Sequence, residues 1–188
     1  MPAALGPCLL VASPALRCPF FHHTVVLLVD HRDSGSLGFV LNRPAAVALR
    51  ELLEHVGAPV SGELPALSVR LGGPVAPETG WIVADPTTGA LPGEGVLRVT
   101  DRLAVCANLD ALRAITAGQG PARRMLMLGY SGWAPGQLDE EIRTGSWIPV
   151  DLDADFVFDA APEGCWLAAL GRLGIDPGRV SAASVAEA

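Results

Sequence analysis

Hydrophobic residues occur along this chain in short runs separated by polar turns, which is typical of short strands with a few helices between them. The run Thr24–His31 is apolar at nearly every position. Such a strand is covered on both faces, so we expect it in the interior of a sheet. A turn at Asp33-Ser34-Gly35 joins it to the next strand. The other predicted strands are Cys8–Ala12, Leu37–Leu41, Ser68–Leu71, Trp81–Ala84, Val96–Val99, Met125–Leu128 and Trp147–Leu152.

Capping and helix-ending residues predict four short helices. Asn108 can cap a helix that Gly118 stops, and Gly145 lies just past the end of another. Between these elements, the loop Asp85–Gly95 is rich in Pro, Gly and Thr, so we expect it to be exposed to solvent. The small residues from Ser181 onwards predict a frayed tail. The predicted helices are Arg50–Val56, Leu109–Ala117, Gln137–Thr144 and Cys165–Leu173.

The chain of 188 residues contains no internal repeat, low-complexity linker or block of charge. It therefore predicts a single compact domain over residues 1–188, long enough to bury a substantial core. The elements do not follow a strict strand–helix–strand rhythm. This order favours the α+β class, with a mixed β-sheet that is compatible with barrel-like closure and is decorated by short helices.

The charge balance argues against nucleic acid as a partner. The net charge is −7, the pI is about 5.0, and all 13 basic residues are arginine. Affinity for duplex DNA comes mainly from neutralising phosphates, and no helix-turn-helix is recognisable, so we expect no direct DNA binding. No stretch is apolar and long enough to span a bilayer, and the amino terminus lacks the features of a signal peptide. These features predict a cytoplasmic protein that does not contact the membrane.

Four cysteines are widely separated and include no C-x-x-C pair. This spacing does not fit a zinc finger or a thioredoxin-like motif, and it favours reduced, partly buried thiols. The sequence predicts no cofactor. Three histidines near the first strands, His22, His23 and His31, could suggest a metal site. Since an extended strand separates His23 from His31, we favour ordinary hydrogen-bonded histidines and predict no metal.

Three segments carry a resemblance to a known family. They are Thr24–His31 followed by Gly38-Phe-Val-Leu-Asn-Arg-Pro44, then Leu71-Gly-Gly-Pro-Val75, then Gly129-Tyr-Ser-Gly-Trp through Ile142, with Trp147 beyond. In their order and spacing these segments resemble the YqgE/AlgH family of bacterial proteins. The resemblance covers the chain from about Leu9 to Trp166.

The resemblance implies a compact bacterial α+β protein, in a family often labelled as transcriptional regulators without a defined mechanism. It transfers no catalytic residue. The family usually has an acidic residue before the proline of an early D-P-x-F element, where this chain has Cys18. It commonly has Ala at the position of Ser131 and Glu at that of Asp139. The change at Cys18 puts in doubt any shared role for that carboxylate.

Asn42 and Arg43 end an apolar strand immediately before Pro44. Arg43 can fork onto a carboxylate or phosphate. We favour a structural role, in which Asn42 caps a turn and Arg43 pairs internally, over a ligand cleft. Gly72 and Gly73 could form a backbone nest for an anion. Because no phosphate-loop pattern accompanies them, we favour a tight turn in which these glycines adopt positive φ.

The segment Gly129-Tyr-Ser-Gly-Trp imitates a nucleophile elbow, but Trp133 takes the place of the required glycine, and every histidine precedes Ser131. We therefore do not expect a serine hydrolase. Tyr130, Trp133 and Trp147 are expected to form an aromatic cluster. On the following helix, Gln137 and Glu141 flank a buried stripe of Leu138 and Ile142. Because a buried guanidinium needs an acceptor, we predict that Arg43 approaches Glu141.

Taken together, these residues favour a non-enzymatic binding or regulatory protein whose partner is a small anionic ligand or another protein. The alternative is an enzyme acting on a small anionic substrate, with Arg43 binding it and Glu141 or His31 transferring protons. No catalytic residue is assigned. The predicted ligand-binding residues are Asn42, Arg43, Gly72, Gly73, Tyr130, Trp133, Gln137 and Glu141.

Overall fold

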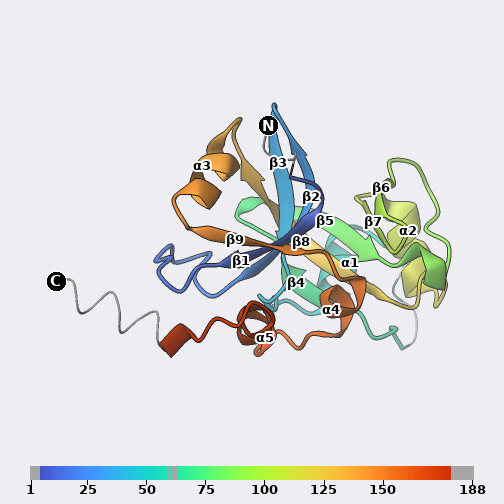
Figure 1. Ribbon diagram of the computed structural model, residues 1–188. Helices are drawn as coiled ribbons and strands as arrows, with labels where there is room; N and C mark the ends of the chain where they lie inside the picture. The colour runs from blue at the N-terminus through green and yellow to red at the C-terminus, as the bar shows by residue number, and fades with distance from the viewer. Residues whose placement is uncertain (1–4, 59, 61–62, 179–188) are drawn as a thin grey trace. The chain divides into compact units, whose positions relative to one another are not determined.

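The computed structural model describes residues 5–58, 60 and 63–178. The chain divides into two compact units: unit 1 is Met1–Arg43 with Ser131–Ala188, and unit 2 is Pro44–Tyr130. One strand, β8 (Arg124–Trp133), runs from unit 2 into unit 1 (Figure 1). The frayed tail predicted from Ser181 lies outside the described residues. The single domain predicted over residues 1–188 stays a prediction.

Unit 1 is built on antiparallel strands in the order β9-β1-β2-β3-β8. The interior position predicted for the long apolar run is confirmed, because β2 pairs with β1 on one side and β3 on the other. Val26 and Leu28, on one face, and Leu27, on the other, have no exposed surface. The strands of this unit besides β8 are β1 (Cys8–Ala12), β2 (Val25–Arg32), β3 (Gly35–Val40) and β9 (Trp147–Asp151).

Close backbone packing explains two glycines of the β2–β3 hairpin. A Cβ on Gly38 would lie 2.8 Å from the carbonyl oxygen of Leu27 and equally close to a methyl group of Val26. Gly35 has φ of +131°, and a Cβ there would lie 2.6 Å from the carbonyl oxygen of Trp133. Only glycine fits at these two positions without moving the neighbouring strand.

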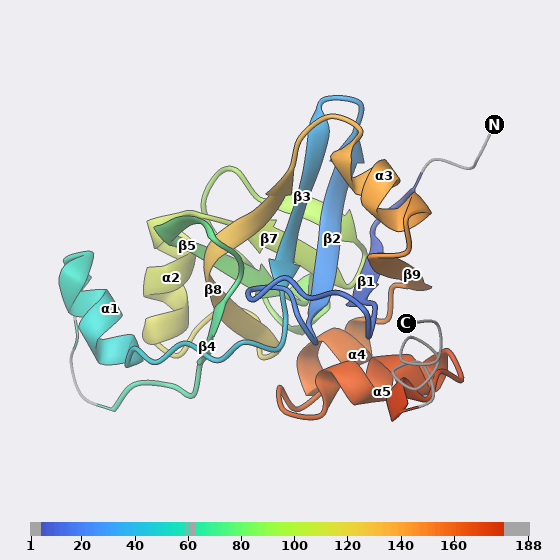
Figure 2. The same ribbon diagram turned by 90° about the vertical axis from the view of Figure 1, so that its left-hand side faces the viewer.

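Three helices accompany the strands of unit 1: α3 (Gln137–Arg143), α4 (Ala154–Asp159) and α5 (Cys165–Arg172). In Figure 2, α3 lies beside the β2–β3 hairpin and α5 lies at its base. Helix α4 was not expected from the sequence. Asp153 caps it by accepting the backbone N–H groups of Asp155 and Phe156, so a capping residue was present in the sequence. The helix was missed because it is short and acidic residues interrupt its apolar pattern.

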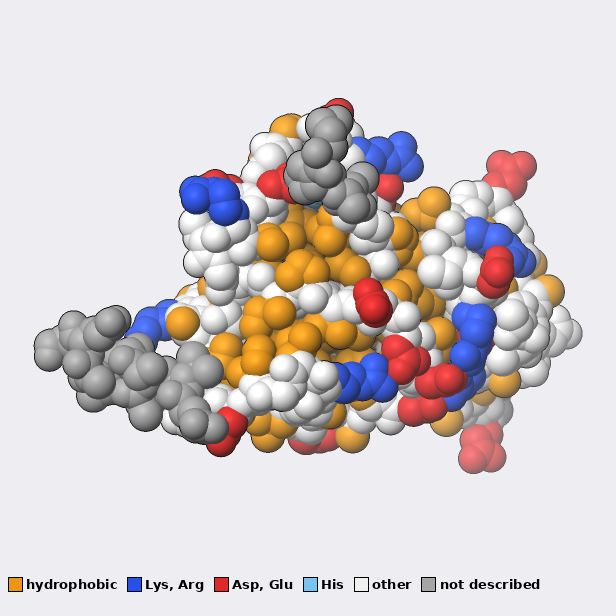
Figure 3. Space-filling model, viewed as in Figure 1, with side chains coloured by type: hydrophobic (Ala, Val, Ile, Leu, Met, Phe, Trp, Pro, Cys, Tyr) orange, Lys and Arg blue, Asp and Glu red, His pale blue; other side chains and the backbone are white. Residues whose placement is uncertain are grey.

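Strand β9 is an edge strand, since it pairs only with β1 among the described residues. Its central residue is Pro149, which lacks a backbone N–H and so cannot donate to an added strand. Ile148 and Val150 beside it are partly exposed. Figure 3 shows apolar side chains gathered on this face of unit 1, between α3 and α5. The proline is a typical device against uncontrolled strand pairing.

Unit 2 has the strand order β6-β7-β5-β8-β4. β4 runs parallel to β8 and the other pairs are antiparallel, so the predicted mixed sheet is confirmed. Its core includes Leu53, Ile82 and Ile115. Asn108 caps α2 by accepting the N–H of Ala111, as predicted. The elements are α1 (Leu49–His55), β4 (Ser68–Leu71), β5 (Val75–Ala84), a 3-10 turn (Pro86–Thr88), β6 (Leu97–Thr100), β7 (Leu103–Cys106) and α2 (Leu109–Thr116).

Unit 2 also corrects several expectations. Strand β7 was not predicted, and β5 and β8 are longer than expected. Asp85, expected in an exposed loop, is fully buried and meets Thr87 and Arg102. Burial by itself would raise the pKa of Asp85, but hydrogen bonds from Thr87 and Arg102 outweigh it and hold that pKa below its usual value.

The strand pairs follow an open path. It begins at β6 and ends at β9, and these two strands do not pair with each other among the described residues. The sheet therefore does not close into a barrel. The fold is α+β, with a mixed sheet and short helices, as the element order predicted.

Candidate functional site

The turn that precedes β2 is held by Asn42 and Arg43, which lie shortly after the end of β3. The Asn42 side-chain oxygen accepts the N–H of Val25 at 3.0 Å, and its nitrogen donates to the carbonyl of His23 at 2.9 Å. Arg43 donates from its guanidinium to the carbonyl oxygen of His22 at 2.6 Å. Asn42 thus makes structural bonds, but to the turn before β2 and not to the turn at Pro44 that the sequence suggested. Together these bonds fix the backbone of His22 and His23.

Two histidines and a tryptophan form a stack at this turn. The ring centroids of His22 and His23 are 3.5 Å apart, and those of His23 and Trp166 are 3.8 Å apart, with near-parallel planes. Trp166, on α5, is buried and donates its indole N–H to the carbonyl of Ala12 at 2.8 Å. The stack is therefore anchored at its tryptophan end, while both histidines are exposed.

The charges that act on His23 are positive. Desolvation lowers its pKa, and the neighbouring His22 and Arg43 lower it further. The protein as a whole carries a net charge of −7. Arg43 thus makes the turn a local cationic site on an acidic protein, and an anion there would be stabilised by its guanidinium.

A layer of aromatic rings lies next to this turn. The Phe21 ring centroid is 6.3 Å from that of Trp133 and 5.5 Å from that of Trp147, and the two tryptophans are 6.0 Å apart. The predicted contact between Trp133 and Trp147 is confirmed. Phe21, which directly precedes His22 in the chain, connects this layer to the histidine stack. Tyr130 instead makes a ring contact with Trp81, at 6.1 Å, within unit 2.

Glu141 accepts three hydrogen bonds beneath this layer. One carboxylate oxygen accepts the indole N–H of Trp133 at 2.9 Å and that of Trp147 at 2.8 Å. The other accepts the amide N–H of Gln137 at 2.8 Å. Gln137 also accepts the backbone N–H of Ala134 at 3.0 Å, which ties the preceding loop to α3. The carboxylate is thus a structural acceptor for buried donors.

The predicted approach of Arg43 to Glu141 does not produce a direct pair between the two side chains. Arg43 bonds to the carbonyl of His22, and Glu141 bonds to Trp133, Trp147 and Gln137. The described residues contain no ion pair between the two. The prediction assumed that the guanidinium needed a carboxylate, whereas a backbone carbonyl accepts from it and neutral N–H donors satisfy Glu141.

Gly72 and Gly73 are buried in unit 2 and belong to a close backbone packing. The N–H of Gly72 donates to the carbonyl of Leu128 at 2.8 Å. Opposite them, Gly129 has φ of +65°, and a Cβ there would lie 2.6 Å from the carbonyl oxygen of Gly73. The expected positive φ is wrong for Gly72 and Gly73 and occurs at Gly129 instead. We therefore assign this pair to packing against β8.

Two other residues that the sequence singled out, Ser131 and His31, are not arranged for catalysis or metal binding in the described structure. Ser131 is fully buried within β8, so no strand–turn–helix elbow exposes its hydroxyl. His31 lies with Nδ1 2.8 Å from the hydroxyl of Ser36 and Nε2 3.5 Å from a carboxylate oxygen of Asp139. Among the described residues, no group of three or more His, Cys, Asp or Glu side chains is arranged to hold a metal ion.

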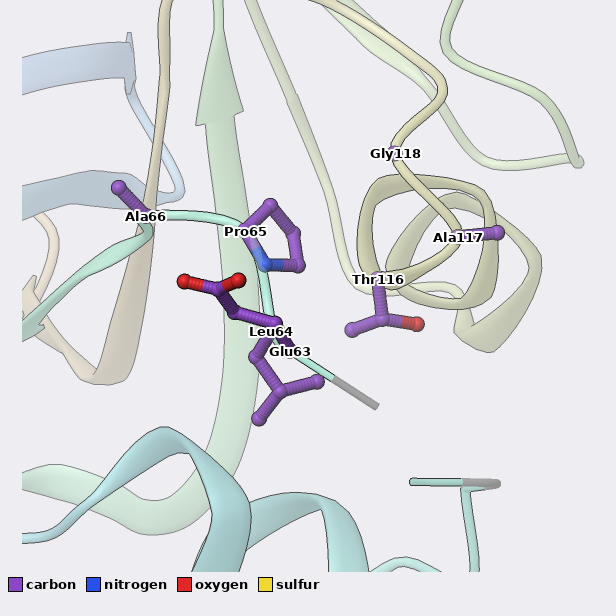
Figure 4. A pocket seen from close by; sticks show the side chains of 7 residues that line it. All are labelled: Glu63, Leu64, Pro65, Ala66, Thr116, Ala117 and Gly118. Carbon is purple, nitrogen blue, oxygen red and sulfur yellow. The ribbon is translucent and has the colours of Figure 1, made fainter. Parts of the chain in front are cut away.

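A hollow in unit 2 lies apart from the predicted residues. It has a volume of about 600 Å³ and opens between the chain before β4 and the end of α2. Figure 4 shows its lining, in which Glu63 is the one charged side chain. None of the residues predicted from the sequence lines it. Its lining residues are Glu63, Leu64, Pro65, Ala66, Thr116, Ala117 and Gly118.

The sequence-based interpretation missed the roles of Phe21, His22, His23 and Trp166. A signal for them existed: the doublets Phe20-Phe21 and His22-His23 stand directly before the central strand. The sequence suggested ordinary hydrogen-bonded histidines or metal ligands, but not a ring stack. Trp166 could not be linked to them, because it lies more than a hundred residues away in the chain.

Comparison with solved structures identifies the class of protein. The chain is similar to the solution structure of the AlgH protein from Pseudomonas aeruginosa, with a TM-score of 0.77, 33% identity, and coverage of 97% of this chain and 95% of that one. A crystal structure of a Corynebacterium diphtheriae protein shares the fold, with a TM-score of 0.70, 24% identity, and coverage of 89% and 87%. The fold therefore defines a class of small α+β bacterial proteins.

Sequence comparison then gives the family. A family model described as AlgH-like matches residues 9–178. A UPF0301 protein of Ruegeria pomeroyi is 42% identical, with coverage of 94% of this chain and 95% of the relative. Another, from an Anaeromyxobacter strain, is 40% identical, with coverage of 94% and 91%. The chain belongs to the AlgH-like family, which confirms the resemblance seen in its motifs.

Within the described part of the chain, no helix combines the length and apolar character needed to cross a membrane. The cytoplasmic location predicted from the sequence stays a prediction.

Proposed function

We propose that this AlgH-like protein is a non-enzymatic binding protein, and that Arg43, His22 and His23 hold an anionic group of a small ligand. The observation that carries the proposal is the hydrogen bonding of the Arg43 guanidinium. Its guanidinium makes one hydrogen bond, to the carbonyl of His22, and no ion pair among the described residues. A guanidinium has five N–H donors, so several remain available for a carboxylate or phosphate.

The surroundings support an anion as the ligand. His22 and His23 each add a ring N–H that can donate to an anion, and the bonds from Asn42 and Arg43 hold their backbone in place. Because the turn is already held in place, binding of an anion does not have to offset the entropy lost by ordering it.

The hydrogen bonding of Glu141 supports the non-enzymatic part. A general base needs a free lone pair directed at its substrate, and both oxygens of Glu141 already accept bonds from Trp133, Trp147 or Gln137. His31 contacts polar groups of Ser36 and Asp139 at its two ring nitrogens. The two groups considered for proton transfer thus have partners within the protein. A regulatory role stays a prediction from the family resemblance.

The proposal is tested by titrating the full chain with inorganic pyrophosphate and following backbone amide chemical shifts. We expect the largest shifts at His22, His23 and Arg43. Arg43→Gln should weaken binding at least about tenfold, because a charge-assisted hydrogen bond contributes roughly 1.5–3 kcal/mol. Arg143→Gln is the matched control, since it removes an equal charge at an exposed pair with Glu140. Equal weakening by both variants, or no shift at the turn, would overturn the proposal.

A further inference from the structure

The ring stack at the turn has one buried end and one exposed end. His23 has near-parallel rings on both sides, Trp166 at 3.8 Å and His22 at 3.5 Å. Two partners so close must lie on opposite faces of the His23 ring, so the order of the stack is Trp166, His23, His22. Trp166 is buried, with 6% of its surface exposed, and forms the inner end. His22 forms the outer end and is exposed.

The backbone is held in an unusual conformation that makes this stack. His23 has φ of 55°, one of two non-glycine residues with positive φ in the described chain. In an extended chain, the side chains of consecutive residues point to opposite sides. The left-handed conformation of His23 instead accompanies neighbouring side chains that stack face to face. Backbone strain of this kind persists where the surroundings fix it, and it is common at binding sites.

The outer face of His22 is an open stacking surface. Its ring has one ring partner, His23, within the described residues. Aromatic rings and nucleobases stack on histidine and tryptophan faces, with an affinity that depends little on the identity of the base. A planar base placed on His22 would extend a stack that already contains three rings.

Arg43 contacts the backbone of the residue that forms this outer end. Its guanidinium donates to the carbonyl oxygen of His22 itself, at 2.6 Å, so the cation and the stacking surface belong to the same residue pair. A ligand with a flat aromatic ring and an attached phosphate can therefore engage both at once. The remaining donors of the guanidinium suit the oxygens of a phosphate.

We infer that the ligand class of this site is a nucleoside monophosphate, whose base stacks on His22 and whose phosphate is held by Arg43. The inference rests on the proposed function, because it names the ligand of the same cationic site. Recognition by stacking and charge predicts weak preference among bases, with purines favoured over pyrimidines by their larger ring area.

The test is a titration of the full chain, at one salt concentration, with four probes: adenosine 5′-monophosphate, ribose 5-phosphate, inorganic pyrophosphate and adenosine. Binding is followed by the ring resonances of His22 and His23 and by the indole resonance of Trp166. We expect adenosine 5′-monophosphate to bind roughly tenfold more tightly than ribose 5-phosphate, since stacking of one base contributes a factor of this order. Adenosine should bind more weakly than its monophosphate.

Two variants separate the two halves of the site. His22→Ala should reduce the affinity for adenosine 5′-monophosphate much more than that for ribose 5-phosphate, because only the former has a base to stack. Arg43→Gln should weaken the three phosphate-bearing probes together. His55→Ala, at an exposed histidine of α1, is the control and should change nothing.

Each outcome decides one claim. If adenosine 5′-monophosphate binds no better than ribose 5-phosphate, the stacking inference is wrong and the anion site stands. If adenosine binds as well as its monophosphate, the phosphate role of Arg43 is wrong. If none of the probes binds, both the inference and the proposed function are overturned.

Discussion

The two polar clusters of unit 1 differ in how far their hydrogen-bonding groups are satisfied within the protein. Around Glu141, both carboxylate oxygens accept N–H groups, and two of the donors are indoles of buried tryptophans. Around Arg43, one guanidinium N–H bonds to a carbonyl, and the neighbouring histidine rings are exposed. Both clusters carry charge and both adjoin Phe21. The difference shows that partners, more than residue type, separate a structural charge from one available to a ligand.

The largest effect is expected from Glu141→Ala. Trp133 is 6% exposed and Trp147 3%, so removing the carboxylate leaves two buried indole N–H groups without their acceptor. We expect a loss of about 3 kcal/mol in the free energy of unfolding, since each unsatisfied buried donor costs about 1–3 kcal/mol. Urea denaturation followed by tryptophan fluorescence measures this.

The control for that variant is Glu140→Ala, on the exposed side of the same helix. Glu140 pairs with Arg143 three residues along, and such an exposed pair contributes little because solvent screens it. If the two variants lose equal stability, Glu141 is not the structural acceptor described above.

A smaller effect is expected from Asn42→Ala, which removes the anchors of the turn to Val25 and His23. Val25 is fully buried, so its N–H loses its side-chain acceptor, and we expect a loss of about 1–2 kcal/mol. Asn108→Ala, which removes the cap of α2, should cost about 1 kcal/mol. Only Asn42→Ala should also weaken pyrophosphate binding; weakening by Asn108→Ala would show that general destabilisation, not the turn, controls the site.

Asp153 is a satisfied carboxylate at a more exposed position, so its effect should be smaller still. It caps α4 and accepts a hydrogen bond from Arg172, and this bond is the main reason that its pKa lies below the usual value. Asp153→Ala should cost about 1 kcal/mol at neutral pH.

The pH dependence of that variant follows from the direction of the pKa shift. A carboxyl whose pKa is lowered by folding stabilises the protein above its unfolded pKa, and this contribution is lost as the pH falls through the folded value. The stability difference between the wild type and Asp153→Ala should therefore be full above pH ~4 and shrink in more acidic solution. A difference that stays constant down to pH ~2 contradicts this explanation.

Local patterns predicted most of the elements but few of the partners. The apolar run of β2 predicted an interior strand because burial on both faces is encoded residue by residue. The cap at Asn108 was equally local. Strand β7 was missed, since its four residues are all buried and show no alternation. Asp85 was assigned to solvent, because its partner Arg102 comes seventeen residues later.

The site was predicted in parts, and its parts were joined wrongly. Arg43 and Glu141 were both singled out as charges near apolar segments, but their partners are backbone carbonyls and indoles that no local pattern identifies. The stack of His22 and His23 depends on a positive φ and on Trp166, and neither can be predicted from residue spacing. Contacts between residues far apart in the chain therefore determine which of the predicted residues are available to bind a ligand.

Arg43→Gln tests the central claim most directly, because it should alter binding while hardly altering stability. The measurement is the free energy of unfolding of this variant and of the wild type, each with and without saturating pyrophosphate. Without ligand, we predict a difference of about 1 kcal/mol or less, since one hydrogen bond to a carbonyl is lost. With ligand, the wild type should gain stability and the variant should not, because only the state that binds is stabilised. A variant that is several kcal/mol less stable, or that is stabilised by pyrophosphate as much as the wild type, would contradict the assignment of Arg43 to ligand binding.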